Sequence, residues 1–290
     1  MVAALEAYPC VRQTRRANFL GTMKILVTGG TGVLGRALVQ AIEQAAHAVR
    51  IGSRRPRPEG TPPHREWAQM DVATGEGVCA ALAGVESVIH AASDPRRPAA
   101  VDVNGTQLLV EAARAAGVGH FVYVSIVGID RIPLGYYRCK LAAEKIVVSS
   151  ALPYSILRAT QFHTLVDMLL TTAARVPVVI PIPTKFRIQS VAPADTAERL
   201  VRCLVEGPGE RLPDFGGPEV LTLGEAAEQW RVARAVRKRV MHLPVPGKIA
   251  AAFRTGENTV RAGEHGTVCW REWLLKADSI PELSSRRTSR

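Results

Sequence analysis

Three polar side chains in the middle of the chain have the types and the spacing that proton transfer to an oxygen atom requires. Ser125 ends an apolar run, residues 120–125, that predicts a β-strand, and Tyr136 and Lys140 follow in a predicted helix. Their i, i+4 spacing places the phenol and the ammonium on one helix face. An ammonium beside a phenol favours the phenolate, so we expect the pKa of Tyr136 to lie below its reference value of about 10. Tyr136 could then exchange a proton with a carbonyl or alcohol oxygen while Ser125 hydrogen-bonds the same oxygen.

Tyr137 leaves the choice of tyrosine open, because it lies at i, i+3 to Lys140 and could take the same role. The Tyr-x-x-x-Lys pattern is also weak evidence when it stands alone. Proton exchange with a carbonyl group accompanies transfer of a hydride, so this interpretation requires a nucleotide cofactor site elsewhere in the chain.

A glycine-rich turn between a predicted strand and a predicted helix is such a site. Apolar residues predict the strand at 24–28 and the helix at 33–46. Glycines between them allow a sharp turn, close approach of backbone N–H groups to a pyrophosphate, and tight packing of a helix whose N-terminus favours negative charge. We therefore predict a dinucleotide-binding βαβ unit that contacts the cofactor through Thr28, Gly29, Gly30, Thr31, Gly32, Val33, Leu34 and Gly35.

Two other interpretations of this turn carry less weight. Gly30 and Gly35 have the spacing of a P-loop, but Arg36 and Ala37 stand where a P-loop needs lysine and then serine or threonine. A tight turn without a ligand would also suit the glycines. The position of the turn between a strand and a helix favours the dinucleotide-binding interpretation.

The end of the second predicted strand, at 48–53, indicates which dinucleotide is bound. NAD-preferring sites place Asp or Glu there to accept hydrogen bonds from the ribose 2′-hydroxyl. This chain has Ser53, Arg54 and Arg55 instead, and a guanidinium can bind a 2′-phosphate through two hydrogen bonds. We therefore predict a preference for NADP(H) over NAD(H). The alternative is an exposed basic loop, which the prolines that follow would accommodate.

The remaining strand signals alternate with helices and set the fold class. Strands are predicted at 66–70, 86–91 and 152–158. The alternation predicts an α/β fold, a Rossmann-type doubly wound parallel sheet with a small C-terminal lobe that covers the substrate. The small residues at the end of the 86–91 strand would let backbone lie against the cofactor, and they are Ala91, Ala92 and Ser93.

Several of these motifs together are similar to a known superfamily. The glycine spacing GxxGxxG and the Ser…Tyr-x-x-x-Lys set resemble short-chain dehydrogenase/reductase (SDR) proteins. DVNGTQLLVEAARAAGV resembles the NVxGTxxLLEAAxxAGV helix of extended and atypical members, with Asp102 in place of the asparagine. The segments YYRCKLAAEK and ILRATQFH, with the basic strand end, resemble the atypical members called NmrA-like or NAD(P)H-binding proteins. The resemblance covers approximately residues 23–205.

The resemblance implies further site residues. Asp71 and Val72 would lie near the adenine, and Lys140 would also contact the cofactor. The segment after the 152–158 strand would pass the nicotinamide into a substrate pocket formed by Gln161, Phe162 and His163. For Phe162 an ordinary core position is an equal alternative, and for His163 we favour a helix cap or a buried hydrogen-bonding role. The interval from Ser125 to Tyr136 is shorter than in most extended members.

These observations predict an NADPH-dependent reductase of a small carbonyl or quinone-like substrate, with Tyr136 as the proton donor. The family also contains members that bind NADP without turnover, which gives a second hypothesis: a catalytically silent redox-sensing regulator that acts through a protein partner. Nucleic-acid binding, suggested by the net charge of +11, is a distant third because no binding motif accompanies the charge.

Composition and patterning give expectations about setting and organisation. Five widely spaced cysteines favour free thiols in a reducing cytoplasm, and we expect no metal, no membrane segment, no specific nucleic acid, and a monomer or homodimer. A basic run from Arg231 to Arg239 is assigned to the exposed face of a helix. The expected divisions are 1–22 as a disordered extension, 23–160 as the dinucleotide-binding core, 161–283 as the remaining sheet elements and lobe of the same domain, and 284–290 as a frayed tail.

Overall fold

The structure is a computed structural model, and it describes residues 21–277. The expected extension at 1–22, apart from its last two residues, and the expected tail at 284–290 lie outside the described residues.

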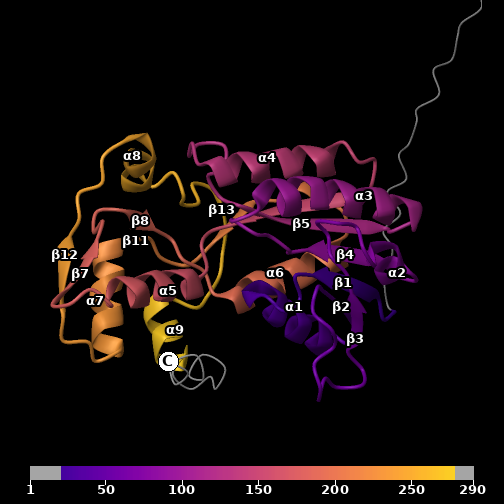
Figure 1. The fold of residues 1–290 in the computed structure, drawn as a ribbon, viewed down its shortest axis with the longest axis horizontal. Helices are drawn as coiled ribbons and strands as arrows, with labels where there is room; N and C mark the ends of the chain where they lie inside the picture. The colour runs from indigo at the N-terminus through magenta and orange to yellow at the C-terminus, as the bar shows by residue number, and fades with distance from the viewer. Residues whose placement is uncertain (1–20, 278–290) are drawn as a thin grey trace, which may run out of the picture.

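A nine-stranded sheet forms the centre of the molecule (Figure 1). Its strand order is β13-β10-β6-β5-β4-β1-β2-β3, β9 pairs with β6, and every pairing is parallel. The predicted doubly wound parallel sheet is confirmed. The strands are β1 Lys24–Thr28, β2 Ala48–Ser53, β3 Glu66–Gln69, β4 Ser87–His90, β5 His120–Ile126, β6 Tyr154–Ala159, β9 Glu210–Arg211, β10 Asp214–Gly216 and β13 Gly263–His265.

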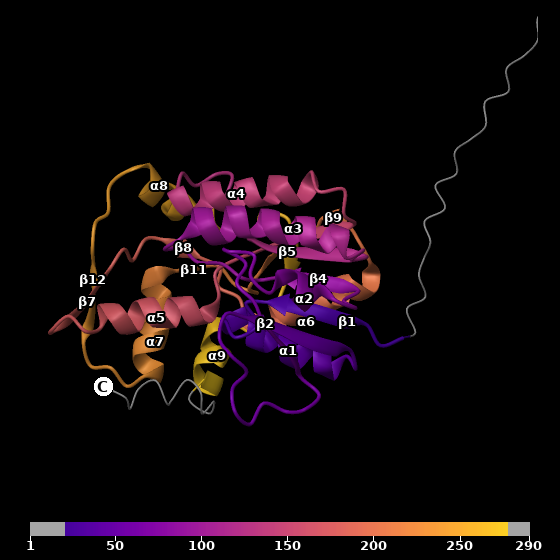
Figure 2. The same cartoon turned by 45° about the vertical axis from the view of Figure 1, so that its right-hand side comes forward.

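Helices cover both faces of this sheet (Figures 1 and 2). Because side chains alternate along a strand, Ile25 and Val27 of β1 pack on one face and Leu26 packs on the other. The first face is covered by α1 Val33–Gln44 and α6 Pro193–Glu206. The second is covered by α2 Val78–Leu82, α3 Gly105–Ala115 and α4 Gly135–Val148. A π-helical turn, η1 Ala99–Asn104, leads into α3.

A smaller lobe begins where β6 ends, and it lies beside the sheet in both views (Figures 1 and 2). Its own core contains Leu170, Trp230 and Trp270. Two small strand pairs, β7 with β12 and β8 with β11, complete it. Its elements are α5 His163–Ala173, β7 Val179–Ile182, β8 Arg187–Ile188, β11 Leu221–Thr222, α7 Leu223–Ala233, β12 Arg239–His242, α8 Lys248–Thr255 and α9 Trp270–Ala277.

The basic run from Arg231 to Arg239 does not form the solvated helix face that was predicted. Helix α7 ends at Ala233, and Arg239 begins β12. The run is held by intramolecular partners: the ammonium of Lys238 donates to two carbonyl oxygens after α5, and Arg234 pairs with Asp167. These cations therefore join α5 to the segment that follows α7.

Within residues 21–277, no helix has both the length and the apolar character that crossing a membrane would require.

Candidate cofactor and catalytic site

The turn after β1 has a geometry that only glycine satisfies at two positions. Gly29 has φ +68°, and a Cβ there would lie 2.9 Å from backbone atoms of Ala92. A Cβ on Gly35 would collide with the carbonyl oxygen of Gly29, so α1 can pack this closely on the turn only without a side chain there. Strand, turn and helix thus form a cradle whose backbone faces outward, as dinucleotide binding requires.

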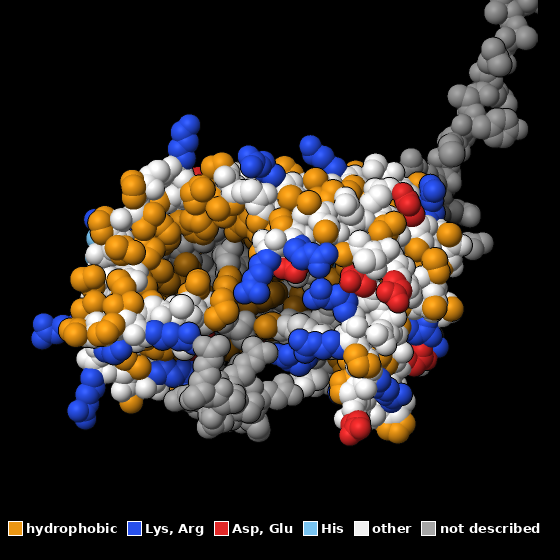
Figure 3. All heavy atoms as spheres, in the orientation of Figure 1, with side chains coloured by type: hydrophobic (Ala, Val, Ile, Leu, Met, Phe, Trp, Pro, Cys, Tyr) orange, Lys and Arg blue, Asp and Glu red, His pale blue; other side chains and the backbone are white. Residues whose placement is uncertain are grey.

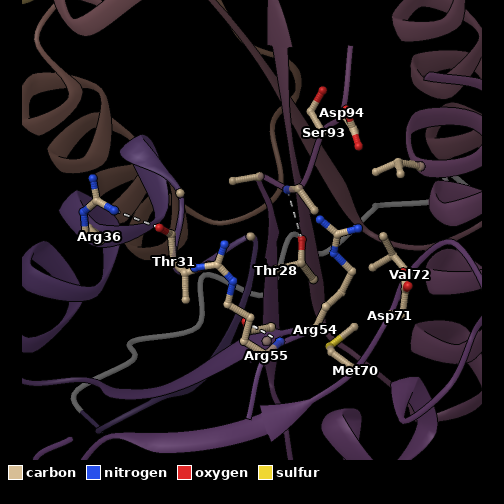
Figure 4. Close-up of a pocket in the computed structure, with 17 residues that line it drawn as sticks. Thr28, Thr31, Arg36, Arg54, Arg55, Met70, Asp71, Val72, Ser93 and Asp94 are labelled. Carbon is tan, nitrogen blue, oxygen red and sulfur yellow. Dashed lines mark hydrogen bonds between the residues drawn. The ribbon is translucent and has the colours of Figure 1, made fainter. Parts of the chain in front are cut away.

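A cavity of about 340 Å³ opens beside this cradle, at the carboxyl ends of β1, β2, β3 and β4 (Figure 4). It brings together most of the predicted cofactor residues: Thr28, Gly29, Thr31, Gly32, Ser53, Arg54, Arg55, Asp71, Val72, Ala91, Ala92 and Ser93. Gly30, Leu34 and Gly35 are buried and Val33 is exposed, and none of the four lines the cavity. Their contact with a cofactor stays a prediction.

Arginines concentrate positive charge at this cavity. Arg55 extends toward Thr31, and Arg54 crosses toward the side where Ser93 lies (Figure 4). Arg36, in the first turn of α1, also lines the cavity and donates a hydrogen bond to the carbonyl oxygen of Thr31 at 2.9 Å. The sequence analysis used Arg36 only to exclude a P-loop. Its place one residue after the last glycine, in the turn of helix that faces the phosphates, is the signal that could have identified it.

Asp71 lines the cavity, but part of its carboxylate is already engaged. Its Oδ1 accepts a hydrogen bond from the backbone N–H of Ala73 at 2.9 Å, which fixes the turn after β3. The second oxygen is the one that could accept a hydrogen bond from a ligand.

A line of hydrogen bonds runs from the cavity to a buried carboxylate. Ser93 donates to Asp102 Oδ1 at 2.6 Å, and the phenol oxygen of Tyr136 lies 2.7 Å from the Ser93 hydroxyl oxygen. Because the one proton of Ser93 is committed to Asp102, Tyr136 is the donor to Ser93. Asp102 is fully buried in η1 and lies 3.6 Å from the ammonium of Lys140. The sequence comparison noted Asp102 only as a departure from the family asparagine.

Lys140 is buried, and it does not line the cavity. Its ammonium donates to the carbonyl oxygen of Val124 at 2.9 Å and lies 4.2 Å from the centre of the Tyr123 ring. Burial lowers the pKa of Lys140 to about 8, and the neighbouring Asp102 carboxylate opposes this shift.

The pKa of Tyr136 moves in the direction opposite to the one expected from the sequence. Burial raises it to about 12, although the hydrogen bond to Ser93 opposes the shift. The expectation that Lys140 would lower this pKa was wrong for the protein alone, because burial of the phenol dominates and the nearby Asp102 carboxylate raises the pKa further. The phenol therefore keeps its proton at neutral pH.

Unpaired polar atoms gather near the ends of β5 and β6. Among the described residues, Ser125 Oγ, Thr160 Oγ1 and Gln161 Oε1 are buried without a hydrogen-bond partner. Unsatisfied buried polar groups are rare unless a ligand or water completes them. The amide of Gln161 also donates to the phenol oxygen of Tyr137 at 3.3 Å. The two tyrosines thus face different partners: Tyr136 faces Ser93 and Tyr137 faces Gln161.

The other two predicted pocket residues pack within the protein. Phe162 is half-buried against the core beneath α1 and α6. His163 is fully buried, and its two ring nitrogens hydrogen-bond to Ser190 Oγ at 2.8 Å and to the carbonyl oxygen of Val268 at 3.1 Å. Its ring contacts the rings of both Trp270 and Trp273, which stack on each other. The structure therefore places His163 in the core of the lobe rather than in a pocket, which fits the hydrogen-bonding role that we favoured.

Residues 29–206, more than half of the chain, match a protein family described as NAD(P)H-binding. The chain belongs to the NAD(P)H-binding family. The SDR-like resemblance inferred from the motifs is confirmed by this match.

Individual relatives agree with this family assignment. The chain is 34% identical over 115 residues to a 3-beta-hydroxysteroid dehydrogenase of Mycolicibacterium neoaurum, a match that covers 35% of this chain and 31% of that protein. It is 31% identical over 153 residues to a 2-alkyl-3-oxoalkanoate reductase of Stenotrophomonas maltophilia, covering 44% of this chain and 46% of that protein. The chain thus spans less than half the length of these curated relatives.

A solved structure shares the fold. The triphenylmethane reductase of Citrobacter sp., crystallised with NADP(H), superposes with a TM-score of 0.72 at 20% sequence identity. The superposition covers 88% of this chain and 99% of that one.

Proposed function

We propose that this protein is an NADPH-dependent reductase that converts a small carbonyl or quinone-like substrate to the corresponding alcohol or quinol. The observation that carries the proposal is the position of Ser93. This residue lines the cofactor cavity and hydrogen-bonds Tyr136, so the proposed proton donor is connected directly to the cofactor site.

The cavity fits a phosphorylated dinucleotide. The glycine turn packs so closely that a Cβ at Gly29 or Gly35 would collide with backbone, which leaves the N-terminus of α1 open toward a ligand. Arg36, Arg54 and Arg55 line the cavity and supply positive charge for phosphate groups. No carboxylate follows β2 to repel a 2′-phosphate, which supports NADP(H) over NAD(H). When bound, NADPH supplies the hydride.

The protein's own groups then handle the proton. Tyr136 holds a proton at neutral pH, because burial raises its pKa to about 12, and a protonated phenol is the form that a reduction needs. Ser125 has an unpaired hydroxyl that can donate a hydrogen bond to the same substrate oxygen. The hydrogen bond from Ser93 to Asp102 fixes the Ser93 hydroxyl, which in turn positions the phenol of Tyr136. The ammonium of Lys140 neutralises the buried carboxylate of Asp102.

A second candidate function is a redox-sensing regulator that binds NADP(H) without turnover and acts through a protein partner. The raised pKa of Tyr136 favours it, because a phenol this weakly acidic and already hydrogen-bonded to Ser93 is a reluctant proton donor.

The test is consumption of NADPH at neutral pH with a panel of small aldehydes, ketones and quinones, run beside a direct titration of NADPH. A reductase binds NADPH and oxidises it with at least one substrate class. Tight NADPH binding with no substrate in the panel would favour the sensor, and no NADPH binding would reject both functions.

A further inference from the structure

A second cavity, of about 520 Å³, lies in the C-terminal lobe away from the cofactor cradle. Three segments form it: the connection from β7 to β8, residues 242–246 at and after the end of β12, and Arg254 of α8. Figure 3 shows hydrophobic side chains gathered over this lobe around a hollow. The apolar lining residues of the cavity are Pro183, Phe186, Leu243, Pro244, Val245 and Pro246.

Three of these lining residues are prolines, which makes the apolar wall rigid. Proline fixes its own φ and restricts the residue before it, so the wall loses little conformational freedom when a ligand binds. A preformed apolar cavity of this kind suits a ligand with an apolar body.

The polar lining residues give this cavity a positive charge. Lys185 and Arg254 contribute cations, and no carboxylate is among the lining residues in the described part of the chain. Arg254 donates to the carbonyl oxygen of Val245 at 2.9 Å, which uses one of its N–H groups. Within residues 21–277 the ammonium of Lys185 has no carboxylate at ion-pair distance. The cavity therefore offers cations that an anionic ligand could pair with.

One lining residue connects the cavity to a neighbouring hydrophobic cluster. Phe186, a lining residue, stacks on Phe253 with ring centres 5.4 Å apart and planes inclined by 15°. Phe253 in turn packs in the cluster that contains Tyr136 and Tyr137.

We propose that this cavity binds a small molecule with an apolar body and one carboxylate. Phe186 and the prolines hold the body, and Lys185 and Arg254 bind the carboxylate.

The test uses 4-phenylbutanoate as the probe, measured by titration calorimetry at pH 7.5 with the full chain, both alone and saturated with NADPH. Its neutral counterpart 4-phenylbutanamide has the same body, and acetate has the charge without the body. We expect saturable binding of the carboxylate and at least about tenfold weaker binding of the amide, because a charge-assisted hydrogen bond is lost. Acetate should bind too weakly to measure.

Variants assign the binding to this cavity. Lys185→Ala should weaken the binding of 4-phenylbutanoate about threefold to tenfold. The effect is limited because the side chain of Lys185 is exposed to water. Lys185→Glu should weaken the binding further. Lys145→Ala, an exposed lysine at the end of α4, is the matched control and should change nothing. NADPH affinity should be the same in all three variants.

Equal affinity for the carboxylate and the amide, no saturable binding of either, or unchanged affinity in Lys185→Ala would each overturn the proposal. Because the probe contains no carbonyl group to reduce, its binding is independent of turnover. Failure of the reductase function would instead appear as missing NADPH binding or missing NADPH oxidation, with 4-phenylbutanoate binding intact.

Discussion

The cofactor cradle and the cavity of the C-terminal lobe are built in different ways. The cradle comes from one short stretch, β1, the glycine turn and α1, and its shape depends on close backbone packing at Gly29 and Gly35. The lobe cavity joins residues 183–186 to residues 242–254, and its lining consists mainly of proline, other apolar and basic side chains. A glycine turn of this kind recurs in proteins with many different functions, whereas selective ligand recognition in a cavity depends on its particular side chains.

The largest effect is expected where backbone packing leaves no room. In Gly35→Ala the new Cβ would collide with the Gly29 carbonyl oxygen, so α1 must move off the turn. We expect NADPH binding, measured by titration calorimetry, to fall below detection, while 4-phenylbutanoate binding in the lobe is retained. Gly119→Ala is the control, because its Cβ would have only an ordinary contact at 3.5 Å. Normal NADPH affinity in Gly35→Ala would refute a cradle that depends on backbone packing.

The cradle was predictable because its signals are local. An apolar strand, a glycine turn and an apolar helix follow each other within residues 24–44, and the structure has them with nearly the predicted bounds.

The lobe and the proton-donor network were not predictable in the same way. Strands β9, β10 and β13 have two or three residues each and exist only through pairing with distant segments. Helix α9 was not recognised, because its burial depends on Trp270 packing against α7 from across the lobe. The Tyr136–Ser93 contact joins residues 43 positions apart, so no local pattern carries it.

A smaller but cofactor-specific effect is expected at the arginines that follow β2. The double variant Arg54→Ala, Arg55→Ala should weaken the binding of NADPH at least about tenfold, because charge-assisted hydrogen bonds to a 2′-phosphate contribute about 1.5–3 kcal/mol each. Its affinity for NADH should change little. Arg57→Ala is the control, since this arginine bonds carbonyl oxygens of its own loop. Equal affinity of the wild type for NADPH and NADH would exclude the predicted preference.

The smallest effect is expected in how the free energy of unfolding depends on pH, through the buried histidine of the lobe. Burial lowers the pKa of His163 from 6.5 to about 4. Because the folded-state pKa is the lower one, the unfolded chain binds more protons below pH 6.5, and stability falls as the pH falls toward 4. Between pH 7 and pH 5 this histidine should lower the free energy of unfolding by about 2 kcal/mol.

Urea unfolding at pH 7 and pH 5 measures this effect. In His163→Gln, which keeps a hydrogen-bonding side chain but does not titrate, the loss of stability between the two pH values should be smaller by about that amount. His64→Gln is the control, because His64 is exposed. An identical loss in His163→Gln and the wild type would contradict the assignment of His163 as a neutral core residue.

We propose that Tyr136, rather than Tyr137, gives the proton in an NADPH-dependent reduction. The most direct measurement is the rate of NADPH oxidation by Tyr136→Phe and Tyr137→Phe with one confirmed carbonyl substrate, alongside the NADPH affinity of each variant. We predict that Tyr136→Phe loses about 10²–10⁴-fold in rate, the usual contribution of a general acid, with NADPH affinity nearly intact, and that Tyr137→Phe is mildly affected. Full activity in Tyr136→Phe, or an equal loss in Tyr137→Phe, would contradict the claim.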